Sequence, residues 1–339
     1  MKSNDNYLNI LRHNGGFHPV EKWLQYAEKN NFKKTISTKL KSCPDCNNGN
    51  LIKFGQYIYY SNIIHIKNCP NCGLYFSDTL LDQEVIAQHF ENSYKDELYF
   101  ESQRKYIFKH IASLANKFTK ENGSLLDIGG GKGHVLNNIK NRRPDIHVTL
   151  NDLSRISCDY CSEAYGIKSI CCGIPSLQKL NVHFNTILMI DVIYYEPKLN
   201  EMFSTISKLL EPDEQSTLII RVPNKLRLIV FCQSLLNLFG SSRKLEFQGS
   251  VKYFNPEHIY IFSKSYLKCR LKELGFNRVT FIPSPLLSKA NEKEGFYNRI
   301  FFQFANVICK LTAGKMILSP SMVVIAKKNM ANKPNEIER

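Results

Sequence analysis

The sequence predicts an α/β fold in which a mostly parallel, doubly wound sheet follows a small cysteine-bounded unit. Two observations predict this arrangement. From Ser124 onward, short apolar runs alternate with amphipathic stretches, which is typical of a parallel sheet covered by helices on both faces. Before that point, two C-x2-C pairs enclose segments of strand-like composition. The 339 residues suffice for one large domain or two ordinary ones.

The N-terminal third divides into three predicted segments. Residues 1–40 are polar, with one short helical patch, HPVEKWLQYAEKN. Residues 41–80 hold the cysteine unit, in which FGQYIYY and IIHIKNC have the composition of strands. Residues 81–122 predict a helical linker, because YIFKHIASLANKF repeats apolar residues at helical spacing.

Residues 123–339 carry the alternation that predicts the sheet and form one predicted domain. The expected strands, in chain order, are SLLDI, HVTLND, FNTILMIDV, STLIIRVPN, RVTFI and SMVVIAKK. Helices are expected at VLNNIK, SRISCDYCSEAY, LNEMFSTISKLL and SKSYLKCRLKELGF. The amphipathic stretches LRLIVFCQSLLNLF and RIFFQFANVICKL predict core or lid helices, with docking on a membrane surface or a partner subunit as the alternative.

Composition indicates a soluble globular protein, with 43% hydrophobic and 22% charged residues. No apolar run reaches the roughly 18 residues of a membrane-spanning helix, and the N-terminus lacks the apolar segment of a signal peptide. We therefore expect a cytoplasmic protein whose eleven cysteines are metal ligands and buried thiols rather than disulfides. The net charge of +15 suggests acidic partners, but the cations are spread along the chain, so a generally basic composition explains it as well.

A glycine-rich turn, in SLLDIGGGKGHVLNNI, joins the first strand of the sheet to the helix that follows. A P-loop requires a serine or threonine after Lys132, where this chain has a glycine. The dinucleotide fingerprint requires a small residue at the position of His134. The P-loop hydroxyl is therefore absent, and a pyrophosphate would pack poorly against the start of the helix. What is present is an acid followed by alternating glycines: Asp127, Gly129, Gly131 and Gly133.

This turn suits a ligand that carries an ammonium group and no phosphate. The glycines let the backbone close around a zwitterion, and Asp127 can accept a hydrogen bond from an ammonium. Asp152 ends the next expected strand, where an acid can bind both hydroxyls of a ribose. S-adenosylmethionine has both a ribose and an amino-acid tail. The alternative is a purely structural turn with Asp152 as a helix N-cap.

Five segments together resemble the class I S-adenosylmethionine-dependent methyltransferases. LLDIGGGKGHVL resembles their first motif, VTLNDLS the acidic second strand and FNTILMIDVIYYEP the fourth strand. LLEPDEQSTLIIRVPN is similar to the fifth strand and its approach, and MVVIAKK to the last, antiparallel strand. The resemblance runs from about Ser124 to Lys328. It implies a Rossmann-like, mostly parallel seven-stranded sheet and an enzyme that transfers a methyl group from S-adenosylmethionine.

The resemblance also implies the residues of the site. Cofactor contacts are expected at Asp127, Gly129, Gly131, Gly133, Asp152 and Asp191. Where related enzymes often have an acid–histidine pair after the fourth strand, this chain has Tyr194 and Tyr195. His258 matches a histidine position frequent in the branch that includes quinone O-methyltransferases, so we expect it to be the general base, with Tyr195 nearby. A capping histidine and aromatic packing at the mouth of the site are the alternatives.

The cysteine unit has the spacing C-x2-C-x22-C-x2-C. Four thiolates in tetrahedral array favour zinc and leave no open position, which predicts a structural zinc ribbon. Its expected ligands are Cys43, Cys46, Cys69 and Cys72. The further pair Cys158 and Cys161 falls on an expected helix, where core packing is favoured over a second metal site.

An N-terminal ribbon before this fold resembles two groups of methyltransferases. One contains sugar C- and O-methyltransferases of cell-surface glycan and secondary-metabolite pathways, and the other contains certain ribosomal-RNA methyltransferases. Between Cys43 and Cys72 the only cations are Lys53 and Lys67, which are few for binding phosphates. A small-molecule or glycan-linked acceptor is therefore expected. An RNA-directed enzyme, or a non-catalytic binding module that kept the fold, is the alternative.

Overall fold

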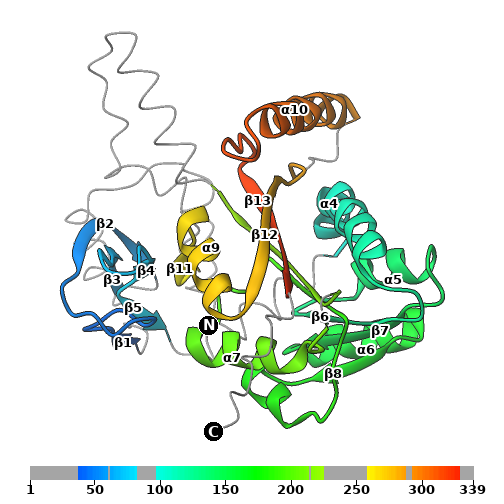
Figure 1. The fold of residues 1–339 in the computed structure, drawn as a ribbon, viewed down its shortest axis with the longest axis horizontal. Helices are drawn as coiled ribbons and strands as arrows, with labels where there is room; N and C mark the ends of the chain where they lie inside the picture. Colours follow the sequence, from blue (N-terminus) through cyan, green and yellow to red (C-terminus); the bar gives the residue numbers. More distant parts are fainter. Residues whose placement is uncertain are drawn as a thin grey trace, which may run out of the picture.

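The computed structural model describes residues 37–59, 62–81, 97–213, 215–224, 258–287 and 292–328 (Figure 1). The helices expected at HPVEKWLQYAEKN and LRLIVFCQSLLNLF lie outside these residues.

The centre of the molecule is a seven-stranded sheet with the order β12-β13-β10-β9-β6-β7-β8. Its strands are β6 (Ser124–Ile128), β7 (His147–Asp152), β8 (Lys168–Cys171), β9 (Thr186–Ile190), β10 (Thr217–Pro223), β12 (Phe276–Pro283) and β13 (Ser321–Lys328). The five strands from β10 to β8 are mutually parallel, and β13 runs antiparallel to both of its neighbours. The prediction of a Rossmann-like, mostly parallel seven-stranded sheet is confirmed.

The strand order reverses between β9 and β6, because the chain leaves β6 toward β7 on one side and returns to β9 on the other. Ligands of such sheets bind in the crevice outside the carboxyl ends of the strands at this switch point. The glycine turn follows β6, and Asp191 follows β9. The fold therefore brings both expected cofactor segments to one edge of the sheet.

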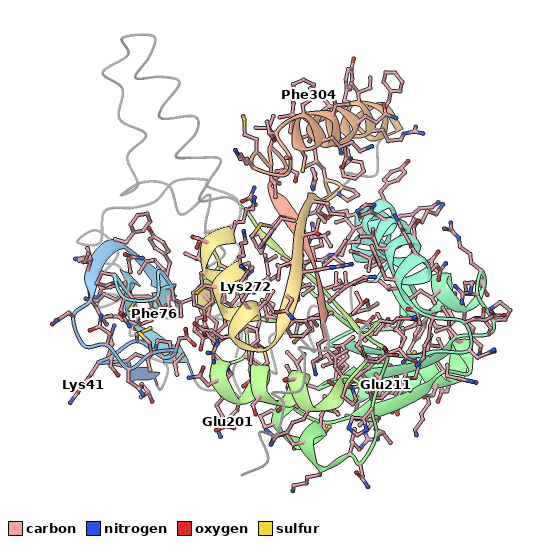
Figure 2. All side chains as sticks on the ribbon, viewed as in Figure 1. Lys41, Phe76, Glu201, Glu211, Lys272 and Phe304 are labelled. Atoms are coloured by element: carbon pink, nitrogen blue, oxygen red, sulfur yellow. The ribbon has the colours of Figure 1, made fainter. Side chains whose placement is uncertain are left out.

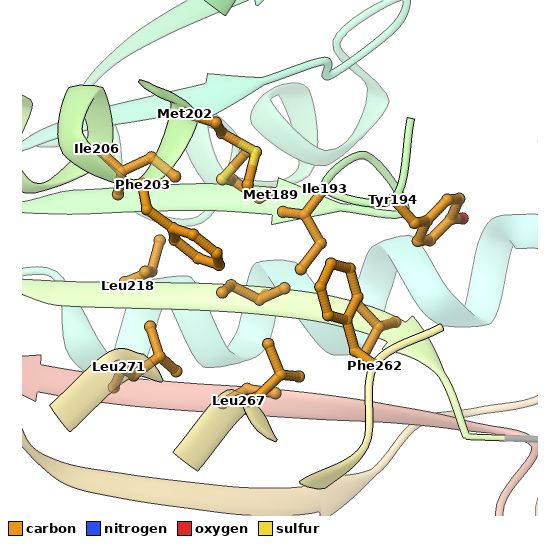
Figure 3. Packing of buried hydrophobic residues seen from close by; sticks show 14 of the residues in the cluster. Met189, Ile193, Tyr194, Met202, Phe203, Ile206, Leu218, Phe262, Leu267 and Leu271 are labelled. Carbon is orange, nitrogen blue, oxygen red and sulfur yellow. The ribbon is translucent and has the colours of Figure 1, made fainter. Parts of the chain in front are cut away.

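Helices cover the two faces of the sheet. One face packs against α4 (Glu97–Phe118), α5 (His134–Lys140) and α6 (Arg155–Tyr165). The other packs against the 3-10 helix η1 (Ile174–Lys179), α7 (Leu199–Leu209) and α9 (Lys264–Glu273). Because side chains alternate along a strand, Leu126 enters one core cluster and Leu125 the other. Figure 3 shows Phe203 of α7 and Leu267 and Leu271 of α9 meeting over the central strands.

The ribbon forms a separate, four-stranded antiparallel sheet with the order β11-β4-β3-β2. Its strands are β2 (Ile52–Tyr59), β3 (Asn62–Asn68), β4 (Tyr75–Ser77) and β11 (Tyr260–Ile261), and β1 (Ser37–Lys39) pairs with β5 (Thr79–Leu81) beside it. Strand β11 belongs to the C-terminal half of the chain, yet it pairs with β4. The segment that follows His258 is therefore part of the ribbon sheet.

Polar contacts also hold the ribbon against the helices. The guanidinium of Arg270, on α9, lies 3.4 Å from a carboxylate oxygen of Asp45, in the first cysteine pair. The side chain of Asn200, on α7, donates to the carbonyl oxygen of Asp45 at 2.9 Å. The loop of the first cysteine pair is thus in contact with α7 and α9 on one face of the central sheet.

Helix α10 (Glu292–Leu311) is inserted between β12 and β13. Strand β12 runs parallel to β10, so its carboxyl end lies at the same edge as the crevice. The ring of Phe302 on α10 contacts His110 on α4, with centroids 5.3 Å apart. Arg299 lies over the ring of Tyr106, also on α4, at 5.9 Å. The two helices therefore lie side by side above the edge (Figure 1).

Candidate cofactor and acceptor site

The glycine turn after β6 has a backbone that only glycine adopts without strain. Gly129, Gly131 and Gly133 have φ angles of 66°, 56° and 78°. Space is also limiting, since a Cβ on Gly129 would lie 2.5 Å from Val192 and one on Gly133 would lie 2.3 Å from the sulfur of Cys161. The three alternating glycines of the sequence are thus required by this turn.

Gly130 is an additional requirement that the sequence analysis did not single out. A Cβ at Gly130 would lie 2.6 Å from a carboxylate oxygen of Asp127 and 2.6 Å from Leu150. In the sequence, the uninterrupted run IGGG could have indicated the requirement for glycine at position 130. The turn consequently passes close over the Asp127 carboxylate.

Asp127 is buried, and neither of its carboxylate oxygens has a hydrogen-bond partner among the described residues. Burial, with a smaller contribution from the nearby Asp152, raises the pKa of Asp127 to about 8. An unpaired buried carboxylate costs free energy that a cationic ligand group removes. The site at Asp127 therefore fits the ammonium of an amino-acid tail.

Asp152 closes the turn from the neighbouring strand. One of its oxygens accepts a hydrogen bond from the backbone N–H of Gly131 at 2.8 Å, and the other accepts from the N–H of Ser154 at 2.9 Å. Burial raises the pKa of Asp152 in spite of these donors. The next residue, Leu153, is 69% exposed, so the end of β7 presents an acid and an apolar side chain together.

Asp191 lies on the other side of the switch point and forms a buried charge cluster. One of its oxygens accepts hydrogen bonds from Arg104 on α4, at 2.8 Å, and from Arg221 on β10. Arg221 also donates to the hydroxyl of Ser284 at 2.7 Å. Burial alone would raise the pKa of Asp191, but the two guanidinium groups outweigh it and lower the pKa. Asp191 also has a φ of 62°, a left-handed backbone that non-glycine residues adopt mainly at functional sites.

The two arginines are functional-site candidates that the sequence analysis missed. Arg221 interrupts the apolar strand sequence STLIIRVPN, and a charge inside a buried strand was a usable signal. No local pattern distinguishes Arg104 from the other cations of its helix.

Three aromatic rings lie close together in the structure. Tyr194 and Tyr195 follow β9, and His258 precedes β11. The rings of Tyr194 and His258 have centroids 3.8 Å apart, and those of Tyr195 and His258 are 5.3 Å apart and perpendicular. Burial, then the charge of Asp191, raises the pKa of Tyr194 well above its usual value, so Tyr194 stays a neutral phenol. The structure thus brings the two expected catalytic residues, His258 and Tyr195, into contact.

Backbone hydrogen bonds tie this aromatic group to the ribbon. The N–H of Ile259 donates to the carbonyl of Tyr194 at 2.8 Å, and the carbonyl of Ile259 accepts from the N–H of Ser77 at 2.7 Å. His258 is therefore held between the end of β9 and strand β4 of the ribbon. Val192, which contacts the glycine turn, lies only two residues before Tyr194.

The four expected metal ligands come together in the ribbon. All four cysteine sulfurs lie within 4.8 Å of one another, and the pairs Cys43–Cys72 and Cys46–Cys69 are 3.6 and 3.5 Å apart. Zinc–sulfur bonds of about 2.3 Å in a tetrahedron place sulfurs slightly less than 4 Å apart, so the group fits a Zn²⁺ ion. Among the described residues this is the one cluster with such spacing.

The two cysteine loops have the same backbone. The N–H of Asn47 donates to the carbonyl of Cys43, and the N–H of Gly73 donates to that of Cys69, at 2.9 and 2.8 Å. Asn47 and Gly73 follow the second cysteine of each pair and both have positive φ angles, of 59° and 75°. Glycine permits this left-handed backbone after the last ligand, and asparagine performs the same function in the first loop.

A comparison with protein families matches residues 99–280 to the family described as "Methyltransferase domain". This match spans more than half of the chain and contains the glycine turn, Asp152 and the aromatic group. The chain belongs to this methyltransferase family. It is an S-adenosylmethionine-dependent methyltransferase, which confirms the family resemblance and the enzyme class expected from the sequence.

Solved structures similar to this methyltransferase have low sequence identity. An S-adenosylmethionine-dependent methyltransferase from Archaeoglobus fulgidus is 19% identical over 68% of this chain and 99% of that chain, with a TM-score of 0.43. The plantazolicin methyltransferase BamL, in complex with SAH and a triazolic desmethylPZN analog, is 16% identical over 72% of this chain and 91% of that chain, with a TM-score of 0.44. Coclaurine N-methyltransferase is 13% identical over 64% and 71%, with a TM-score of 0.43. A search of curated proteins found no match.

Proposed function

We propose that this methyltransferase acts on a small-molecule or glycan-linked acceptor, with His258 as the general base. The observation that carries the proposal is the contact of His258 with Tyr194 and Tyr195 beside the switch point of the sheet. The three side chains offer apolar ring faces together with phenol and imidazole groups that can form hydrogen bonds. Such a surface suits ring-shaped acceptors that carry hydroxyls.

The cofactor half of the proposed site uses the turn after β6. Asp127 would accept a hydrogen bond from the ammonium of S-adenosylmethionine, and Asp152 would hold the ribose hydroxyls. Leu153 would offer its exposed side chain to the adenine, and Asp191 would lie near the methionine end. When bound, S-adenosylmethionine supplies a methyl group already activated by its sulfonium.

In the acceptor half, His258 would remove the proton of the attacking hydroxyl, and Tyr195 would orient the acceptor. The pKa of histidine lies near neutrality, which suits a general base. Tyr194 is excluded as a phenolate base because its raised pKa keeps the phenol protonated. Most of the rate enhancement would come from in-line positioning of the acceptor.

We also propose that the four cysteines bind a structural zinc ion, because their sulfurs have the spacing of a tetrahedral site and their number leaves no position for a substrate. A cytoplasmic location accords with this proposal, since reducing conditions keep the cysteines available as thiolates.

Calorimetric titration of S-adenosylmethionine into the zinc-loaded protein and into Asp152→Ala tests the cofactor half. We expect binding that the substitution weakens at least about tenfold. A screen of sugar and small-molecule acceptors with His258→Ala tests the acceptor half. Turnover that survives this substitution would exclude His258 as the base, and absence of binding by the folded, zinc-loaded protein would refute the cofactor assignment.

The RNA-directed alternative predicts a different response to salt. Binding to RNA should weaken steeply as the salt concentration rises, because each neutralised phosphate releases counterions. A binding module without catalysis should bind the cofactor and transfer no methyl group to any acceptor.

A further inference from the structure

Helix α10 presents an apolar face to solvent. In the described part of the chain, twelve large hydrophobic side chains are exposed, and seven of them lie on α10. Phe296, Ile300, Phe304, Val307 and Leu311 mark a stripe at helical spacing, with exposed fractions between 48% and 77%. Figure 2 shows Phe304 on the side of α10 that points away from the body of the protein.

The opposite side of α10 already has its packing partners. Ala305 and Cys309 are buried, and Phe302 packs against His110 of α4. The exposed stripe is therefore not needed to attach α10 to the domain. Apolar surface of this extent on one element typically marks a site of interaction.

The surroundings of the stripe are basic. Helix α4 carries four Lys or Arg residues, and its two glutamates, Glu97 and Glu101, lie at its start. Residues 296–315, which cover most of α10 and the turn after it, contain three cations and no acid. Lys105 and Lys109 on α4 and Arg299 and Lys310 on α10 are exposed, while the two glutamates of α10 lie in its first turn. The partner of this face should thus be apolar and anionic together.

We propose that α10 docks in the interface of an anionic membrane. Its apolar stripe would enter the boundary between headgroups and acyl chains, and the cations of α4 and α10 would contact the headgroups. A second copy of the chain fits less well, because a symmetric contact would bring like charges together. RNA fits less well because Ile300, Val307 and Leu311 offer no surface on which bases stack.

The position of α10 gives this docking a consequence for the acceptor. The helix follows β12, whose carboxyl end lies at the same edge of the sheet as the ends of β6 and β9, so docking would bring this edge toward the bilayer. An acceptor attached to a membrane lipid would then reach the site. This last step depends on the proposed function, whereas the docking itself does not. No helix of the described residues is long and apolar enough to cross a membrane.

Flotation with vesicles of phosphatidylcholine, with or without phosphatidylglycerol, tests the proposal on the full chain. We expect binding to the anionic vesicles, and the pair Phe304→Ser and Leu311→Ser should weaken it at least about tenfold. The matched control is the pair Ile52→Ser and Val182→Ser, two exposed apolar residues elsewhere on the surface, which should bind like the unmodified protein. Replacing Lys105 and Lys109 by alanine should reduce the preference for anionic vesicles.

Absence of binding by the unmodified protein would overturn the proposal, as would an equal loss in the control pair. If the unmodified protein did not bind vesicles but formed a dimer that Phe304→Ser with Leu311→Ser dissociated, the apolar face would be an interface with a second copy instead. Cofactor titration of the same samples, without vesicles, separates these outcomes from a failure of the methyltransferase site.

Discussion

The two halves of the proposed site are assembled in different ways. The proposed residues of the turn side, Asp127, the glycines and Asp152, come from one continuous stretch, residues 124–154, which contains two adjacent strands and one turn. The rest of the proposed site, which is the charge cluster of Asp191 and the acceptor half, combines four segments that are distant in sequence. Arg104, Asp191, Arg221 and His258 come from different elements, and the ribbon supports the last. A site of the first kind is encoded locally, whereas one of the second kind exists only after the whole chain has packed.

Among the substitutions considered, we expect the largest effect in the buried charge cluster of Asp191, which forms only when distant segments pack together. We expect Arg221→Met to lower the free energy of unfolding by about 3–5 kcal/mol, because it removes one of the two cations that neutralise Asp191. Urea denaturation measures this change. Arg278→Met, on an exposed position of β12, is the matched control and should change stability by less than about 0.5 kcal/mol. Equal effects of the two substitutions would show that the charge cluster does not contribute to the free energy of unfolding beyond an ordinary surface residue.

Loss of a proposed zinc ligand should affect the acceptor half of the proposed site more than the cofactor half. In Cys69→Ser we expect turnover to fall about a hundredfold, because the ribbon strand that holds Ile259 next to His258 is disturbed. The affinity for S-adenosylmethionine should change by no more than about twofold, since the described contacts of the glycine turn do not include the four ribbon cysteines. Cys269→Ser, at an exposed free thiol, is the control. Equal losses of affinity and turnover would mean that the halves are not independent.

The cofactor half should respond to a single methyl group. Gly130→Ala places a Cβ against Asp127 and Leu150, and overpacking of this kind costs about 1–3 kcal/mol. We expect both stability and cofactor affinity to fall, as measured by thermal unfolding and calorimetry. Gly49→Ala is the control, because nothing lies within 4 Å of a Cβ at that position. An unchanged affinity would indicate that the cofactor lies elsewhere.

A further expected effect is a pH dependence of stability caused by Asp127. Its pKa is about 8 in the folded protein and 3.8 as the ordinary value, so between these values the folded state binds more protons than the unfolded state. The stability of the cofactor-free protein should therefore fall as the pH rises from about 4 to 8. Urea midpoints across this range measure the slope, and Asp127→Asn should reduce it. A slope that is the same in both proteins would mean that Asp127 is already ionised.

The sequence predicted the regular parts of the sheet because their apolar runs are long and local. SLLDI, HVTLND and SMVVIAKK coincide with β6, β7 and β13, and LNEMFSTISKLL contains all of α7. Strand β8 was not predicted because KSIC lies at the sheet edge and lacks a buried apolar run. The two-residue strand β11 forms through pairing with β4, a segment distant in sequence, which no local pattern reveals.

The candidate site was predictable to the extent that backbone chemistry defines it. Positive φ angles require glycine, and a tetrahedral metal site requires four thiolates, so both leave marks at fixed spacing. The partners of Asp191 leave no such mark, since Arg104 and Arg221 reach it across 87 and 30 residues of sequence. Contacts of this kind follow from tertiary packing alone.

The pairing of β11 with β4 bears on how the protein could be shortened or recombined. A fragment that began at residue 97 would retain every strand of the central sheet but would leave the backbone of Tyr260 and Ile261 without its neighbour. Such an unpaired edge, next to apolar side chains that the ribbon now covers, is prone to aggregate. The cysteine unit is therefore not an interchangeable appendage, and exchanging it between related enzymes should succeed only when the strand after His258 is exchanged with it.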